Sequence, residues 1–190
     1  PGMELIQNGQ LEGWPLQFSW GTTVPATILY QAETESLQLN GNEKKTVRLV
    51  GQTETGMTVE KIFSFENSSY LVGLQVVVKN GSSTLLQGMP QLQLSSSALE
   101  SGDNPANRFL FGGAAGYING KLQQVKAKAY AEGPVTFTGK IDWAGYESNY
   151  FLMGIMPDEK SGTSFVAQGT EALTQTVLKG ELDSLQQGAE

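Results

Sequence analysis

Neither cysteine nor histidine occurs among the 190 residues of this chain. Without them a chain cannot build a His or Cys metal site, a Ser/His/Asp triad, a Cys/His nucleophile or a redox dithiol. Most of the common catalytic machinery is therefore excluded, and we assign no catalytic residue, no cofactor-binding residue and no metal ligand. We expect a protein that is not an enzyme and that carries no cofactor.

Charged side chains are also scarce, at 16% of the chain, and their formal balance is -7. Such a surface repels phosphate backbones and anionic lipids over most of the molecule, so nucleic-acid binding is not expected. Lys44, Lys45 and Arg48 form the one notable basic cluster in the sequence. A solvated strand edge explains this cluster more simply than a phosphate site does.

No apolar run approaches the ~18 residues that a membrane-spanning helix needs, and the N-terminus lacks the pattern of a signal peptide. As given, the chain is expected to be soluble and to be a monomer in isolation. Pro1 and Gly2 look like residues added ahead of Met3. We therefore expect the natural protein to extend beyond both ends, which is compatible with a soluble excerpt of a membrane protein.

The stretch MTVEKIFSFENSSYLVGLQVVVKNGSS, which begins at Met57, predicts a hairpin of two long antiparallel strands. In its first half apolar side chains recur at every second position, with Lys61 as the exception. The same alternation runs from Tyr70 to Val78, and the turn-rich ENSS separates the two halves. Four more segments show this habit, namely TILYQAETESLQL, KTVRLVG, LLQGMPQLQLS and PVTFTGKIDW. In the last of them, Val135, Phe137, Ile141 and Trp143 are expected to share one face.

Helix content is expected to be small, because no segment carries an apolar i, i+3, i+4, i+7 stripe over three turns. Residues 95–107, SSSALESGDNPAN, predict a long loop, and GTEALTQT near the C-terminus fits either a loop or an edge strand. The whole pattern predicts a single all-β domain over residues 1–190, folded as a sandwich of antiparallel sheets.

Carboxylates are the remaining acid or base groups of the usual kind, and a glycosidase needs two of them about 5 to 9.5 Å apart. Asp142, Glu147, Asp158 and Glu159 are close in sequence, but their spacing places no two of them on one face of a pocket. Catalysis by this set is not expected. Asp103 and Asn104 supply oxygen ligands, yet a plain turn explains them better than a calcium loop does.

Two further runs have a functional and a structural interpretation. FGGAAGY, residues 111–117, has the small residues of a phosphate loop without its Lys and Ser/Thr ending, which favours close backbone approach, a bulge or positive φ. In WAGYESNYF, residues 143–151, the aromatic side chains could line a groove for a sugar or a peptide, or could fill the core of a sandwich. Spacing alone favours the core.

Three blocks in a fixed order carry a resemblance to a known family: GMTVEKIFSFENSSYLVGLQVVVKN, FGGAAGYINGKLQQVKAKAY and GKIDWAGYESNYFLMGIMP. Over roughly residues 27–190 the chain resembles the large periplasmic domain of the YidC-type membrane protein insertases of Gram-negative bacteria. The residues that stand in the places of the family motif, and to which the resemblance gives a structural role, are Gly56, Val59, Lys61, Phe63, Tyr70, Asn80, Trp143, Gly145, Tyr150, Phe151 and Pro157.

The resemblance implies a twisted, extended β-sandwich, the supersandwich also seen in galactose-mutarotase-like folds. It implies a domain trimmed at both ends, with strands expected before ELI and a final strand and helix after LQQGAE. It also implies a parent protein with one membrane helix before this domain and five after it, in the bacterial inner membrane. The aromatic run from Trp143 is then interpreted as scaffold that joins the two sheets.

Four functional hypotheses follow. The first, implied by the resemblance, is a non-catalytic periplasmic module that assists insertion and folding of membrane proteins, with Sec translocon components and client membrane proteins as partners of the parent. The second is a carbohydrate-binding sandwich in which Tyr117, Trp143 or Tyr146 stacks on sugar rings. A mutarotase-like enzyme generally relies on histidine, which is absent here. Capture of an extended client at an exposed sheet edge is the fourth.

Overall fold

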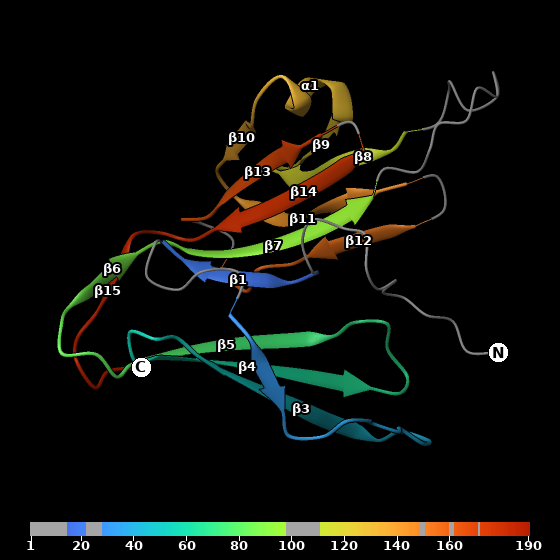
Figure 1. Ribbon diagram of the computed structural model, residues 1–190. Helices are drawn as coiled ribbons and strands as arrows, with labels where there is room; N and C mark the ends of the chain where they lie inside the picture. Colours follow the sequence, from blue (N-terminus) through green and yellow to red (C-terminus); the bar gives the residue numbers. More distant parts are fainter. Residues whose placement is uncertain (1–14, 22–27, 98–110, 149–150, 160–161, 171) are drawn as a thin grey trace. The chain divides into compact units, whose positions relative to one another are not determined.

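The computed structural model describes residues 15–21, 28–97, 111–148, 151–159, 162–170 and 172–190 (Figure 1). Within these ranges most residues lie in antiparallel strands, and the one helix, α1 (Ala127–Ala131), is short. The predicted all-β sandwich with little helix is therefore confirmed. Asp103, Asn104 and most of the predicted loop at 95–107 lie outside the described residues, as do Pro1 and Gly2.

The chain divides into two compact units, and each unit joins segments that are distant in sequence. The first unit consists of Pro1–Ser19 and Met89–Leu182, and the second of Trp20–Gly88 and Asp183–Glu190. The prediction that residues 1–190 form a single domain stays a prediction.

Two sheets build the first unit. The larger has five strands in the order β1-β7-β14-β13-β10, and the smaller has four in the order β12-β11-β8-β9. The bounds of the larger sheet are β1 (Gln17–Trp20), β7 (Pro90–Ser97), β14 (Leu173–Lys179), β13 (Ser164–Gly169) and β10 (Val135–Thr138). Those of the smaller are β12 (Leu152–Ile155), β11 (Ile141–Glu147), β8 (Gly113–Ile118) and β9 (Lys121–Lys126). GTEALTQT thus leads into β14, which lies inside the larger sheet.

The core of this unit lies between its two sheets. Ala114, Ile118, Ile141 and Ala144 come from the smaller sheet, and Phe165, Ala167 and Leu178 come from the larger, together with Val125 and Tyr130. The Phe137 ring stacks on the Phe165 ring with centroids 5.5 Å apart. FGGAAGY supplies β8, and a Cβ added at Gly113 would lie 2.4 Å from the carbonyl oxygen of Val125. The predicted close backbone approach at this run is therefore confirmed.

The second unit contains a four-stranded sheet in the order β2-β3-β4-β5 and the two-stranded sheet β15-β6. Their bounds are β2 (Tyr30–Ala32), β3 (Lys44–Gln52), β4 (Met57–Glu66), β5 (Gly73–Asn80), β6 (Leu86–Gly88) and β15 (Asp183–Leu185). The predicted hairpin of β4 and β5 is confirmed by an antiparallel register from Met57↔Asn80 to Ser64↔Gly73. However, β5 begins at Gly73, so Tyr70 and Val72 lie in the turn and not on the strand.

The expectation of continuous alternation was wrong for three segments. Within the described residues TILYQAETESLQL is a strand only over Tyr30–Ala32, and LLQGMPQLQLS divides into β6 and β7, which belong to different sheets. PVTFTGKIDW forms two strands, β10 and β11, because Gly139 interrupts it with φ 122°. The register then shifts between Ile141 and Trp143, where Ile141 pairs with Ile118 and Trp143 pairs with Tyr117. Consecutive residues of β8 point to opposite faces, so this irregularity turns Ile141 into the core and Trp143 away from it.

Candidate functional site

The outward face of the smaller sheet in the first unit carries two aromatic side chains on neighbouring strands. Trp143 on β11 is the register partner of Tyr117 on β8. Trp143 is half-buried, and the Tyr117 side chain is exposed. Leu122 on β9 is the register partner of Tyr117 on its other side and is exposed as well. The sheet therefore presents an apolar band across three strands on the face opposite the core.

Polar groups border this band. The Gln124 side-chain amide donates to Glu147 over 2.8 Å, which joins β9 to β11 across β8. Tyr146, by contrast, is buried on the core side, and its hydroxyl has no hydrogen-bond partner in the described part of the chain. Of the three aromatic residues proposed for sugar stacking, Tyr117 and Trp143 share the outward face and Tyr146 does not.

Strand β12 forms one edge of the same sheet and is unusually apolar. Phe151, Leu152, Met153 and Met156 are all exposed. None of residues 151–156, FLMGIM, carries a charge. The opposite edge, β9, begins and ends with lysines, Lys121 and Lys126, which is a common protection against unwanted strand pairing. The β12 edge lacks that protection.

Two glycines face each other where β11 and β12 meet. Gly145 pairs with Gly154, and a Cβ added at Gly145 would lie 2.0 Å from the carbonyl oxygen of Met153. A Cβ added at Gly154 would meet ordinary contacts, the nearer of them 3.6 Å away, with Trp143 Cε3 at 3.7 Å. The indole of Trp143 thus lies beside bare backbone of β12. Gly145 is fixed by packing, whereas Gly154 has room.

The predicted strand, turn and strand after Trp143 are confirmed, since β11 and β12 pair antiparallel. Both strands belong to one sheet, so the expectation that this run joins two sheets was wrong. Tyr150 lies outside the described residues. Phe151 is exposed, Pro157 follows β12, and the structural role predicted for these motif residues stays a prediction.

The candidate carboxylates do not assemble into an acid and base pair. Asp142 lies 3.9 Å from the Lys140 ammonium, Glu147 is bound to Gln124, and Asp158 and Glu159 are exposed beyond β12. Within the described ranges, no group of three His, Cys, Asp or Glu side chains is placed to hold a metal ion. The geometry therefore gives these residues no common pocket.

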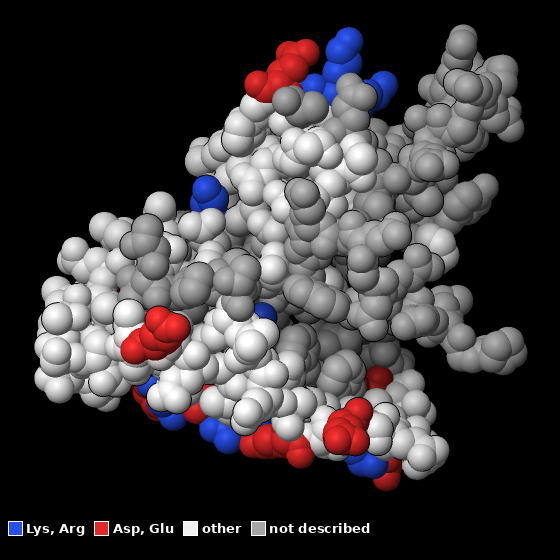
Figure 2. Space-filling view, in the orientation of Figure 1, with Lys and Arg blue, Asp and Glu red and all other residues white. Residues whose placement is uncertain are grey.

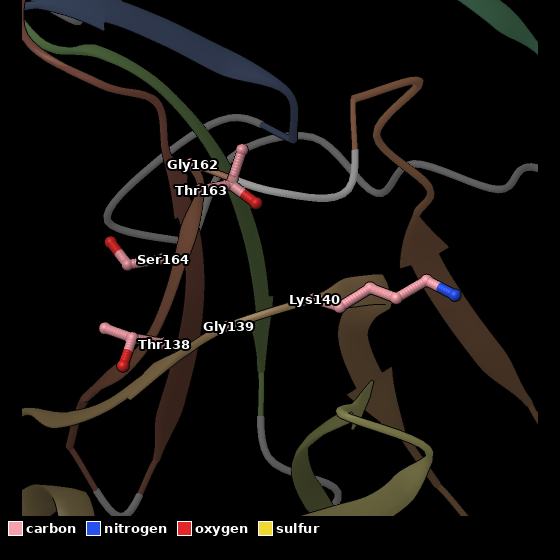
Figure 3. Close-up of a pocket in the computed structure, with 6 residues that line it drawn as sticks. All are labelled: Thr138, Gly139, Lys140, Gly162, Thr163 and Ser164. Carbon is pink, nitrogen blue, oxygen red and sulfur yellow. The ribbon is translucent and has the colours of Figure 1, made fainter.

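A shallow cleft of about 450 Å³ lies at one end of the larger sheet, lined by Thr138, Gly139, Lys140, Gly162, Thr163 and Ser164 (Figure 3). Thr138 and Ser164 are register partners on β10 and β13. In Figure 3 the Lys140 side chain extends away from the three hydroxyl groups. The Asn119 side chain bonds to the backbone of two residues that line the cleft. It accepts a hydrogen bond from the Lys140 N–H and donates one to the Thr138 carbonyl. Among the described residues that line the cleft, Lys140 alone is charged, and its side chain does not converge with the hydroxyl groups on a ligand site.

In the second unit, the motif residues of β4 and β5 fall into distinct environments. Gly56 adopts φ 86° in the turn that precedes β4, and Val59 is fully buried. The Phe63 ring stacks on Phe65 with centroids 6.4 Å apart. Tyr70 is fully exposed at the tip of the hairpin. A single structural role for the whole motif therefore does not follow from these positions.

Lys61 is buried on the apolar face of its sheet. Its ammonium nitrogen lies 4.4 Å from the centroid of the Tyr30 ring, a distance typical of a cation–π contact. Burial removes water from the ammonium and lowers the pKa of Lys61 to about 8. Burial likewise raises the pKa of Tyr30 to about 12. Lys61 interrupts the apolar alternation of β4, as the sequence of this strand indicated.

The basic cluster on β3 is neutralised by carboxylates on neighbouring positions of the same sheet and in the adjoining loops. Arg48 contacts Glu60 at 2.8 Å and Glu33 at 3.0 Å, and hydrogen bonding from Arg48 holds the pKa of Glu60 below its ordinary value. The remaining pairs are Lys44–Glu66, Lys45–Glu43, Lys79–Glu60 and Lys79–Glu190. Figure 2 shows acidic and basic side chains interspersed along this part of the surface. Nothing here favours a phosphate site.

Fold and surface together define a β-sandwich domain with an apolar strand edge and an adjoining aromatic face. Among the described residues, no helix is both long and apolar enough to cross a membrane. The family model of the YidC periplasmic domain matches residues 1–190, the whole chain. This chain belongs to that family, and the predicted resemblance and periplasmic location are confirmed.

Curated relatives agree with this assignment. Membrane protein insertase YidC of Geotalea uraniireducens is 26% identical over 140 residues, which cover 73% of this chain and 26% of that protein. The insertase of Geotalea daltonii is 23% identical over 164 residues, with coverages of 85% and 30%. That of Nitratidesulfovibrio vulgaris is 26% identical over 187 residues, with coverages of 95% and 31%. The chain thus spans about a quarter to a third of the length of these relatives.

Sequence reasoning missed the residues that make the outward face and the edge, namely Leu122, Gln124, Leu152 and Met156. Alternation at a period of two identifies a strand but does not say which face meets the core. The available signal for an unprotected edge was the lack of charge in FLMGIM, in contrast to KLQQVK, which has a lysine at each end.

Proposed function

We propose that this chain is a non-catalytic interaction domain that assists insertion and folding of membrane proteins on the periplasmic side of the membrane. In the parent protein it acts beside the Sec translocon or on client polypeptides. Membership of the YidC periplasmic domain family supports the setting. The observation that carries the choice of an interaction role is the exposed, uncharged run at residues 151–156, because large exposed apolar patches mark sites of association.

Site-specific photo-crosslinking in the full-length parent tests this proposal. A photoreactive phenylalanine analogue would replace Tyr117, Leu122, Leu152 or Met156 in turn, and exposed positions on the second unit, Ser64 and Gln75, would serve as comparison. We expect adducts with translocon subunits or nascent chains from the first set. If no position gives an adduct while the parent still inserts its clients, the domain is a spacer and the interaction role is wrong.

A second candidate function is carbohydrate binding, favoured by the side-by-side Trp143 and Tyr117 with a Gln124–Glu147 pair at their border. Aromatic faces flanked by hydrogen-bonding groups are suited to sugar rings. A glycan array probed with the chain and with Trp143→Ala decides the matter. Binding that the substitution abolishes supports this function, and an array without signal eliminates it.

A further inference from the structure

Within the described part of the chain, no strand pairs with the outer edge of β12. Ser148 donates its backbone N–H to the Phe151 carbonyl over 2.8 Å and so closes the β11–β12 hairpin with a bonded pair. In an antiparallel ladder, bonded and non-bonded pairs alternate. With the register Glu147↔Leu152, Tyr146↔Met153 and Gly145↔Gly154, the N–H and C=O groups of Leu152 and Gly154 point away from β11. Among the described strands, β12 has a neighbour on one side only.

The side chains near this edge are apolar on both faces of the sheet. Leu152 is exposed on the outward face, where the Trp143 indole also lies, beside Gly154. Met153 is exposed on the other face, and Ile155 packs against the core there. A strand added to β12 would therefore meet apolar surface on both of its own faces. The edge therefore suits a segment with apolar residues at consecutive positions. It does not suit an amphipathic strand, in which polar and apolar residues alternate.

We infer that β12 receives an extended, consecutively apolar polypeptide segment of a client protein as an added strand. The inference rests on the proposed function and names the partner of the same surface. Backbone groups in a row select an extended polypeptide over a sugar or a lipid, because their partners must repeat at the spacing of a strand. The absence of charge from residue 151 to 156 selects apolar side chains.

The test measures binding of a fluorescein-labelled peptide, Ser-Gly-Val-Leu-Val-Leu-Val-Gly-Ser, to the whole chain by fluorescence anisotropy. Two variants form a matched pair. Leu152→Lys places a charge on the β12 edge, and Leu71→Lys makes the same change between β4 and β5 in the second unit. The two leucines are 56% and 65% exposed, so neither substitution disturbs the core. We expect Leu152→Lys to weaken binding about tenfold or more, and Leu71→Lys to change it by less than about twofold.

Alternate N-methylation of the peptide tests the hydrogen-bonding mode. Methylating the three valines removes the N–H groups on one side of the extended peptide, and methylating the two leucines removes those on the other. One of the two modified peptides is expected to lose binding and the other to retain it. Equal binding of both would show that the contact is only hydrophobic and would overturn strand addition.

Two other results would also overturn the inference. Sedimentation equilibrium that shows a dimer, converted to monomer by Leu152→Lys, together with absence of peptide binding, would make a second copy of this chain the occupant of β12. Absence of both binding and self-association would leave the edge without a partner. Neither result bears on the crosslinking test of the proposed function, because adducts with translocon subunits can form through other surfaces.

Discussion

The side-chain amide of Asn80, at the end of β5, donates a hydrogen bond of 2.9 Å to the backbone carbonyl of Leu185, 105 residues further along the chain. The same amide donates to the Thr84 carbonyl, and its oxygen accepts from the backbone and hydroxyl of Ser82. The Asn80 backbone also bonds to Gly188 and Ala189. One buried asparagine therefore joins β5 to the C-terminal segment Asp183–Glu190 within the second unit.

Asn80→Ala is expected to destabilise the protein by about 2–4 kcal/mol, because it leaves carbonyl groups without the hydrogen-bond donor that the Asn80 amide supplies. Asn80 is 1% exposed, so water does not replace the lost donor. Urea unfolding followed by fluorescence measures the change. Asn42→Ala, at an exposed position, is the control and is expected to shift stability by less than about 0.5 kcal/mol. Equal effects of the two changes would contradict the clamp.

Lys61 predicts an unusual dependence of stability on alkaline pH. Its pKa falls from 10.5 in the unfolded chain to about 8 in the folded one, because burial penalises the ammonium. Between these values the unfolded state binds more protons, so the free energy of unfolding rises with pH. We expect a gain of about 2–3 kcal/mol between pH 8 and pH 10, at 1.36 kcal/mol per pKa unit.

Urea midpoints at pH 7, 8, 9 and 10 check this rise, with Lys61→Met as the comparison. The methionine keeps the length of the side chain without the charge, so the rise is expected to disappear. Above pH 10 ionisation of Tyr30 opposes the effect, since its pKa is raised to about 12 in the folded state and folding then binds protons. Parallel pH profiles for the two proteins would show that Lys61 is not the source.

The two facing glycines of β11 and β12 predict opposite tolerance to the same substitution. Gly145→Ala places a methyl group 2.0 Å from the Met153 carbonyl oxygen and 2.6 Å from the Gly154 Cα, so the strands must separate. We expect a cost of about 2–4 kcal/mol. Gly154→Ala meets only ordinary contacts and is expected to be neutral or slightly stabilising. Thermal unfolding of both variants measures the change in stability. A similar loss of stability in the two variants would contradict the close backbone approach at Gly145.

Residues 1–190 are predicted to unfold as one domain. The second unit is completed only by Asp183–Glu190, which follow the whole of the first unit in sequence. Its clamp at Asn80 therefore requires that the chain on both sides of the first unit be in place. Differential scanning calorimetry is expected to give one transition with equal calorimetric and van't Hoff enthalpies. Two separate transitions would show that the units fold independently.

The sequence alone determined the class of this protein. Missing histidine and cysteine excluded metal sites and nucleophiles that are built from those two residues, alternation at a period of two indicated an all-β fold, and the order of the motif blocks indicated the YidC periplasmic domain family. These inferences succeed because they depend on residue types and local spacing. The β4–β5 hairpin, with Lys61 marking a break in its apolar face, is the clearest example.

Only the tertiary structure decided which apolar residues are core and which are surface. The shift in register after Ile141 turns Trp143 to the outward face, and a single extra residue in a strand has no reliable signature in composition or period. That β12 forms an edge, and that Asn80 meets Leu185, depend on pairings between segments distant in sequence. Local patterns carry no information on such pairings, because they are set by how the sheets pack.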